Sequence, residues 1–101
     1  MNNYELIRKA IETKSQVFAI YNGKHRGLCP HVIGTKRGRE QALCFQFEGS
    51  STSGLPDGGQ WRCLPIEGLE NIELREGEWH TGSHGAMPQS CVDEIDLTVS
   101  Y

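Results

Sequence analysis

The chain of 101 residues lacks any long apolar run. No stretch approaches the roughly 20 consecutive apolar residues that a helix needs to cross a bilayer, so we expect no membrane partner. The first residues, Met1 to Glu5, lack the basic-then-apolar order of a secretory signal peptide, and we expect a cytoplasmic location. The length predicts a single domain over residues 1–101, because chains this short rarely contain two hydrophobic cores.

Signature motifs of several functional classes are also missing. The chain has no Gly-x-Ser-x-Gly motif of the α/β-hydrolases. The glycine-rich stretch 49–59 does not end in the Gly-Lys-Ser/Thr of a phosphate-binding P-loop. The spacing of the acidic residues in the stretch 67–78 is not that of a calcium loop, which needs a glycine and a bidentate last ligand at fixed positions. From these absences we expect neither enzymatic activity nor a cofactor.

The four cysteines lie too far apart to form a Cys-x-x-Cys pair. They are Cys29, Cys44, Cys63 and Cys91. No two of them therefore have the close spacing of a zinc-ribbon or redox motif. Because thiols in the cytoplasm stay reduced, we expect no disulfide. We expect these cysteines to pack as small hydrophobic side chains.

Histidines near two of the cysteines are candidates for a metal site. Cys29 and His31 would share one face of a strand, and His80 and His84 have the i, i+4 spacing of zinc ligands. Gly82 lies between the two histidines in a segment without helical pattern, so the spacing loses its helical geometry. We predict no metal site, and these four residues are the candidates for ligands if one exists. A zinc- or thiol-dependent enzyme remains an alternative.

The apolar pattern predicts one helix followed by short strands. Leu6, Ile7, Ala10 and Ile11 form a stripe at helical spacing, behind an asparagine that can cap the first turn. Later runs are rich in β-branched and aromatic residues and are separated by turn residues such as Asn22-Gly23. We expect a helix at about 3–14, strands at 16–21, 26–33, 41–47, 61–66, 71–75 and 91–101, a charged turn at 34–40 and an irregular segment at 77–90.

These elements predict a mainly β fold. One N-terminal helix and five to six antiparallel strands can form a small, strongly bent, Sm-like sheet or barrel over about residues 16–76. Closing such a sheet removes its exposed edges. Pro30 lacks a backbone N–H, so its strand needs a bulge or an edge position there.

The order of motifs over residues 15–76 resembles the WYL domain family. The matching residues are Tyr21, Arg26-Gly27-Leu28-Cys29-Pro30, Leu43, and Arg62-Cys63-Leu64-Pro65-Ile66 followed by Leu69 to Leu74. The Trp-Tyr-Leu triplet of the family is not present, and Gln41-Ala42-Leu43 stands in its place. The resemblance implies an Sm-like barrel of the kind found in bacterial regulators. It also implies a regulatory role in which Arg26 and Arg62 contact a nucleotide-type ligand.

Basic residues concentrate in the first part of the chain. Residues 1–62 contain nine of the ten Lys and Arg residues, whereas residues 63–101 contain eight of the thirteen acidic ones. The formal net charge of −3 argues against non-specific binding of duplex DNA. Arginine suits phosphate because its planar group donates two parallel hydrogen bonds, and aromatic rings can stack on bases. The predicted ligand-binding residues are Tyr21, Lys24, Arg26, Lys36, Arg37, Arg39, Ser51, Ser53, Trp61 and Arg62.

The predicted function is therefore a non-catalytic binding or regulatory module. Its ligand would be an anion, either a nucleotide or a short single-stranded nucleic acid, bound by a basic face. The basic residues could instead pair with the acidic residues of the same chain. In that case the protein would bind a partner, or a second copy of itself, through an exposed strand.

Overall fold

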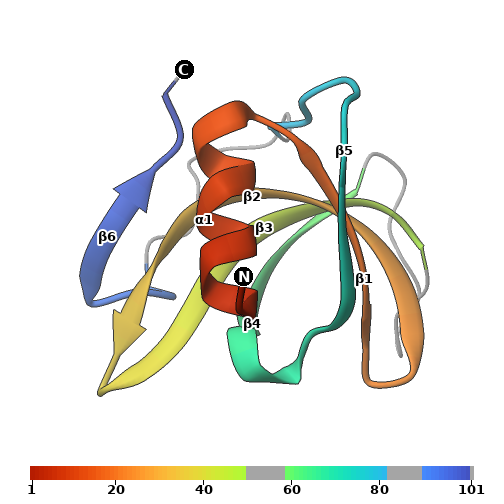
Figure 1. The fold of residues 1–101 in the computed structure, drawn as a ribbon. Coiled ribbons are helices and arrows are strands. Elements are labelled where there is room, and N and C mark those ends of the chain that lie inside the picture. The colour runs from red at the N-terminus through yellow and green to blue at the C-terminus, as the bar shows by residue number, and fades with distance from the viewer. Residues whose placement is uncertain (50–58, 82–89, 101) are drawn as a thin grey trace.

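The computed structural model is mainly β, with a helix packed on an antiparallel sheet (Figure 1). The structure describes residues 1–49, 59–81 and 90–100. Within these residues the elements are α1 (Asn3–Thr13), β1 (Gln16–Tyr21), β2 (Lys24–Lys36), β3 (Arg39–Gly49), β4 (Gln60–Pro65), the 3₁₀ helix η1 (Ile66–Gly68), β5 (Glu70–Arg75) and β6 (Glu94–Thr98). The expected fold class, a bent antiparallel sheet with one N-terminal helix, is confirmed.

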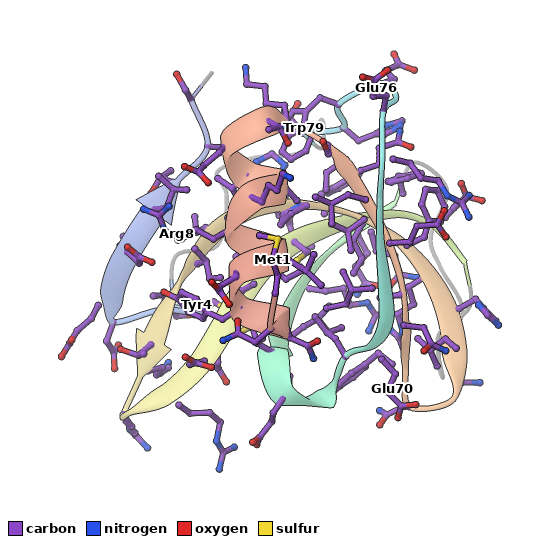
Figure 2. The ribbon with its side chains drawn as sticks, viewed as in Figure 1. Met1, Tyr4, Arg8, Glu70, Glu76 and Trp79 are labelled. Carbon is purple, nitrogen blue, oxygen red and sulfur yellow. A yellow bond between two sulfur atoms is a disulfide. The ribbon has the colours of Figure 1, made fainter. Side chains whose placement is uncertain are left out.

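The strands form one sheet in the order β4-β3-β2-β1-β5, and β6 pairs with β2. β1 pairs with the first half of β2, and β6 pairs with its second half, at Val32 to Thr35. In the described residues β4 and β5 do not pair with each other, so the sheet is not closed into a barrel. Glu70 begins β5 and Glu76 directly follows its last residue (Figure 2). Acidic side chains at an edge strand discourage pairing with another chain.

Helix α1 begins with a capping box. The Asn2 side chain accepts a hydrogen bond from the backbone N–H of Glu5 (2.8 Å), and the Glu5 carboxylate accepts one from the N–H of Asn2 (3.1 Å). These bonds satisfy donors that the first turn would leave free. The helix ends at Thr13, and the cap residue Lys14 after it has a left-handed φ of 51°. Its buried stripe is Ile7, Ala10 and Ile11.

The main hydrophobic core lies between this stripe and one face of the sheet, which we call the inner face. Alternate residues of the strands contribute to it, as strand geometry requires. The strand residues of this core are Val17, Ala19, Leu28, Ile33, Ala42, Cys44 and Leu64. A second cluster lies across the sheet, on the outer face, and consists of Val32, Leu43, Cys91 and Val92 with Trp61 against it.

The structure contains a disulfide between Cys63 of β4 and Cys91, so the prediction of no disulfide is wrong. Their Cα atoms are 5.5 Å apart, although 28 positions separate them in the sequence. They meet because Cys91 lies in the outer cluster and Cys63 pairs with Leu43 of the same cluster, so both are on the outer face. The Gln41 side chain donates a hydrogen bond to the Cys91 carbonyl (2.7 Å) beside them. Cys29 and Cys44 are buried free thiols, as expected.

The charged segment 34–40 differs from its prediction as a turn. β2 continues to Lys36 and β3 begins at Arg39, so only Arg37 and Gly38 turn the chain. Both have positive φ, 52° and 79°. This geometry matches the twist of a hairpin, but arginine is an unusual residue for it. The sequence signal was therefore weak, unlike that of Asn22-Gly23, where the predicted hairpin is confirmed.

Two further expectations concern β2 and β6. The register of β2 against β3 shifts between Pro30 and Val32, which confirms a bulge at the proline. The terminal strand is shorter than the predicted 91–101, because Cys91 and Val92 are buried in the outer cluster before β6 begins. β6 approaches Gly34 so closely that a Cβ there would clash with the Glu94 carbonyl oxygen. Among the described helices, α1 included, none has the length and apolar character needed to cross a membrane.

Candidate anion-binding site

Arg26 projects from β2 onto the inner face of the sheet. It lies opposite Ala19 of β1, and only 4% of its surface is exposed. One terminal nitrogen, Nη1, donates a hydrogen bond to Oε1 of Gln46 (3.3 Å), and the guanidinium lies 5.1 Å from the centre of the Tyr21 ring. Its Nε is buried without a hydrogen-bond partner. A buried positive charge is therefore held by neutral groups.

Arg62 brings a second positive charge to the same place. It lies on β4 opposite Cys44 and two positions from Leu64, so it also faces inward. Its Nε and Nη2 are buried and have no hydrogen-bond partner. Burial and, secondarily, the charge of Arg62 lower the pKa of Arg26. Among the described residues the ion pairs involve Arg8 and Arg75, and neither inner arginine takes part in one.

Two glutamines complete what we call the arginine–glutamine cluster, which consists of Arg26, Gln46, Gln60 and Arg62. Gln46 and Gln60 are paired across β3 and β4, which lie side by side with β2 in Figure 1. Gln46 is fully buried, and its Nε2 donates to the Glu48 carbonyl (3.3 Å). Oε1 of Gln60 is buried without a partner. Sequence reasoning missed both glutamines, although their alternation with the apolar residues of β3 and β4 was the available signal.

The arginine–glutamine cluster has the chemistry of an anion site. Buried N–H groups without acceptors cost free energy, roughly 1–3 kcal/mol for each group. An oxyanion would accept hydrogen bonds from both guanidinium groups and would offset their mutual repulsion. Lys24 is two positions before Arg26 and opposite Tyr21, so the backbone places both on the same face. The structure thus brings together Tyr21, Arg26 and Arg62 of the predicted site and places Lys24 on the same face.

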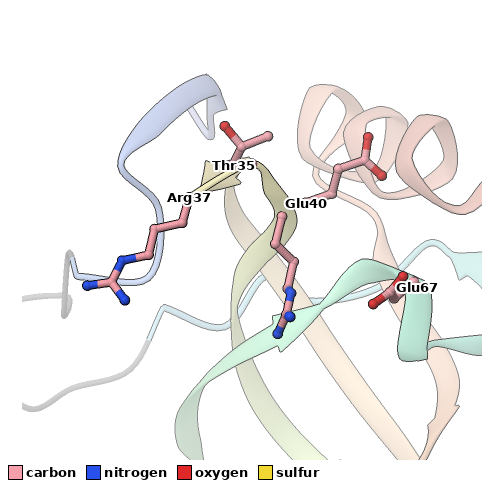
Figure 3. A pocket seen from close by; sticks show the side chains of 6 residues that line it. Thr35, Arg37, Glu40 and Glu67 are labelled. Atoms are coloured by element: carbon pink, nitrogen blue, oxygen red, sulfur yellow. The ribbon is translucent and has the colours of Figure 1, made fainter.

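The basic hairpin Lys36–Arg39 lies elsewhere. Lys36 pairs with Arg39 at one end of the β2–β3 ladder, whereas Arg26 pairs with Gly49 at the other end. Arg37 and Arg39 line an open pocket of about 540 Å³ together with Glu40 and Glu67 (Figure 3). The two carboxylates oppose anion binding there. The Lys36 ammonium group donates a hydrogen bond to the Ser90 carbonyl. The predicted single basic face is therefore not formed.

Trp61, a predicted stacking residue, lies on the outer face. Its ring packs edge-on against Phe45 (5.2 Å between ring centres) and His31 (4.9 Å). It therefore points away from Arg62, its neighbour in β4. Ser51 and Ser53 lie outside the described residues.

The metal-ligand candidates Cys29 and His31 meet the backbone of His80. The N–H of His80 donates to the Cys29 sulfur (3.4 Å), and a ring nitrogen of His31 lies 3.0 Å from the His80 carbonyl oxygen. Burial raises the pKa of the Cys29 thiol to about 11 and lowers that of His31, so both are neutral at pH 7. In the described part of the chain no three His, Cys, Asp or Glu residues are grouped to hold a metal ion. His84 is outside that part.

In comparisons with known proteins, no family model, curated protein or solved structure matches the chain.

Proposed function

We propose that this chain is a non-catalytic binding or regulatory module that recognises an anion, namely a nucleotide or a short single-stranded nucleic acid. The arginine–glutamine cluster is the site in this proposal. The observation that carries it is the pair Arg26 and Arg62, whose guanidinium groups have buried nitrogens without partners and form no ion pair within the described chain. The resemblance to the WYL family supports the same role for these two arginines.

The burial of Arg26 is hard to explain as a contribution to stability. A buried charge without an opposite charge destabilises a fold, and an apolar side chain of similar size would usually serve better. Proteins retain such groups where a ligand needs them. Tyr21 supports a nucleotide or nucleic acid in particular, because its ring already lies against Arg26 and aromatic rings bind bases by stacking.

The experiment is a calorimetric titration with AMP and with a hexamer of deoxythymidylate. R26Q and R62Q keep a hydrogen-bonding side chain and remove the charge. We expect each to weaken binding at least roughly tenfold, since charged hydrogen bonds contribute about 1.5–3 kcal/mol. R37Q is the matched control, because Arg37 lies on the distant exposed hairpin. Binding that survives in the R26Q/R62Q double variant, or is absent from the wild type, would contradict the proposal.

The open edge of β4 favours a second candidate function, a protein-interaction or self-associating module. Within the described residues β4 ends the sheet on one side, and the backbone groups along its outer edge could pair with a strand of another chain. Salt distinguishes the two functions. An anion complex weakens steeply as salt rises, whereas an interface of strand hydrogen bonds and apolar contacts does not. Sedimentation of the protein alone at low and high salt would reveal self-association.

We propose the cytoplasm as the location; the Cys63–Cys91 disulfide is unusual for that compartment and therefore provides the test of this proposal. In a reducing compartment both residues would be thiols, whereas in an oxidising one they would stay bridged. Cells are quenched in acid and alkylated before lysis, and the peptides are examined by mass spectrometry. Alkylation of both cysteines supports the proposal, and a bridged peptide contradicts it.

A further inference from the structure

We infer that the arginine–glutamine cluster selects an anion that carries its own hydrogen-bond donor, and therefore binds phosphate in preference to sulfate. This inference rests on the proposed function and names the chemistry of its ligand. The inference depends on Oε1 of Gln60, a buried acceptor without a hydrogen-bond partner in a site whose other unpartnered groups are donors.

The neighbours of Gln60 do not satisfy this acceptor. Arg62 lies two positions along β4 on the same face, yet its Nε and Nη2 are themselves without partners. Gln46, directly across the ladder, accepts from Arg26 through Oε1 and donates to the Glu48 carbonyl through Nε2. Among the described groups, the Gln60 acceptor therefore stays without a partner, as do Nε of Arg26 and the Nε and Nη2 of Arg62.

The two tetrahedral oxyanions, phosphate and sulfate, differ in whether they can donate a hydrogen bond to this acceptor. Around neutral pH inorganic phosphate retains at least one P–OH group, whereas sulfate has no proton. Both anions can accept hydrogen bonds from Arg26 and Arg62, but only phosphate can also donate one to Gln60 Oε1. Sulfate would place a negative oxygen against that acceptor and leave it unpaired. A site that leaves a buried polar group unpaired rejects the wrong ligand strongly.

The same reasoning applies to phosphate monoesters. A nucleoside monophosphate can supply the donor from its phosphate when protonated, or from a hydroxyl or amino group next to it. Inorganic phosphate and AMP are therefore separate arms of the test. If AMP binds more tightly than sulfate but inorganic phosphate does not, the donor comes from the nucleoside rather than from the phosphate.

The experiment measures dissociation constants for phosphate, AMP and sulfate at pH 7 and constant ionic strength. For the wild type we expect phosphate or AMP to bind roughly 5- to 100-fold more tightly than sulfate. Q60L removes the acceptor. It should make the affinities for phosphate, AMP and sulfate similar, and it should bind sulfate at least as tightly as the wild type does. Q60A repeats the test with a smaller side chain if Q60L does not fold. Q16A is the control, because Gln16 bonds to the Glu78 carbonyl outside the cluster.

The outcomes separate the inference from the proposed function. If the wild type binds phosphate, AMP and sulfate equally, the inference is overturned while the anion site stands. Unchanged selectivity in Q60L and Q60A also overturns the inference, because the discrimination would then arise elsewhere. If neither these three anions nor the deoxythymidylate hexamer binds the wild type, the proposed function itself fails.

Discussion

Arg26 shows how a single residue can serve a ligand at the expense of the fold. It is almost completely buried, and among the described residues it donates a hydrogen bond to the amide oxygen of Gln46 and lies against the ring of Tyr21. Its pKa is lowered by burial and by the charge of Arg62. A lowered pKa for a cationic group means that the folded chain disfavours the charged form relative to the unfolded chain. At pH 7 the arginine remains charged, so its burial destabilises the protein when no anion is bound.

The variant R26M should therefore be more stable than the wild type without ligand. Methionine keeps an unbranched side chain and removes the buried charge, and we expect a gain of about 1–2 kcal/mol. For a chain of this size each kcal/mol corresponds to a rise in melting temperature of about 4–8 °C. Calorimetric melting measures the effect. R8M is the control and should not gain stability, because Arg8 pairs with Glu12 and Asp96. A less stable R26M would show that Arg26 serves the fold.

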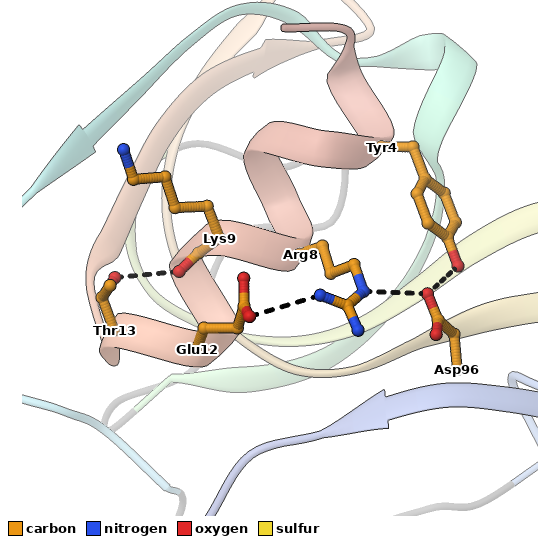
Figure 4. Close-up of polar contacts among 6 residues, drawn as sticks. All are labelled: Tyr4, Arg8, Lys9, Glu12, Thr13 and Asp96. Atoms are coloured by element: carbon orange, nitrogen blue, oxygen red, sulfur yellow. Dashed lines mark hydrogen bonds and ion pairs between the residues drawn. The ribbon is translucent and has the colours of Figure 1, made fainter.

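At the scale of elements, a small polar network joins α1 to β6 (Figure 4). The Tyr4 hydroxyl donates a hydrogen bond to Asp96 Oδ2 (2.7 Å), and Arg8 Nε lies 3.1 Å from the same oxygen. The hydrogen bond from Tyr4, and then Arg8, lower the pKa of Asp96 from its ordinary 3.8. The pKa of Tyr4 is raised to about 12, mainly by burial, so its hydroxyl stays a donor at ordinary pH. The network thus depends on an ionised Asp96.

The stability that Asp96 contributes should depend on pH in a defined direction. Because its pKa is lower in the folded chain, the contribution is complete above pH 3.8 and is lost as the pH falls through the folded value. D96N should be less stable than the wild type at pH 7, and the difference should shrink below about pH 4. Urea unfolding of D96N and of the wild type at pH 7 and at pH 3 measures the difference in unfolding free energy at each pH. A difference independent of pH would contradict this role.

The matched control for this network is E12Q. The Arg8–Glu12 pair is an exposed i, i+4 contact at 3.3 Å, and such pairs contribute only about 0.3–0.5 kcal/mol. E12Q should therefore change stability much less than D96N at pH 7.

At the scale of the whole molecule, the Cys63–Cys91 disulfide joins the C-terminal segment to β4, the strand at the opposite edge of the sheet from β5. It joins β4 to the residues just before β6, across 28 positions of the sequence. A crosslink that closes a loop of this length restricts the unfolded chain and stabilises the fold by about 3–4 kcal/mol. Val92 and Val99, buried on either side of β6, depend on the same segment staying in place.

The double variant C63S/C91S should lose about 3–4 kcal/mol of unfolding free energy. The wild type in a reducing agent should fall to the same level, because both treatments remove the same crosslink. Guanidinium unfolding with and without reductant measures the loss. The double variant itself should not respond to reductant, since Cys29 and Cys44 are free thiols. A wild type whose stability is unchanged by reduction would contradict the assignment.

Local features of the chain were predictable because they depend on interactions between residues close together in the sequence. The asparagine cap, the apolar stripe of α1 and the Asn22-Gly23 hairpin each depend on residues within a few positions. The bulge at Pro30 follows from a missing N–H. The Arg37-Gly38 turn was placed too broadly, because its charged neighbours resemble a loop although they belong to strands. Two of the predicted binding residues, Arg26 and Arg62, do lie together.

The sequence by itself determined the order of helix and strands, because alternation and turn residues encode which segments extend and where they reverse. The tertiary structure alone decided which distant residues share a face. It separated the Lys36–Arg39 hairpin from Arg26, turned Trp61 outward and joined Cys63 to Cys91. It also set Gln60 beside Gln46 and the inner arginines. Register and bulges between strands set these juxtapositions, and a shift of one position would send every side chain of a strand to the other face.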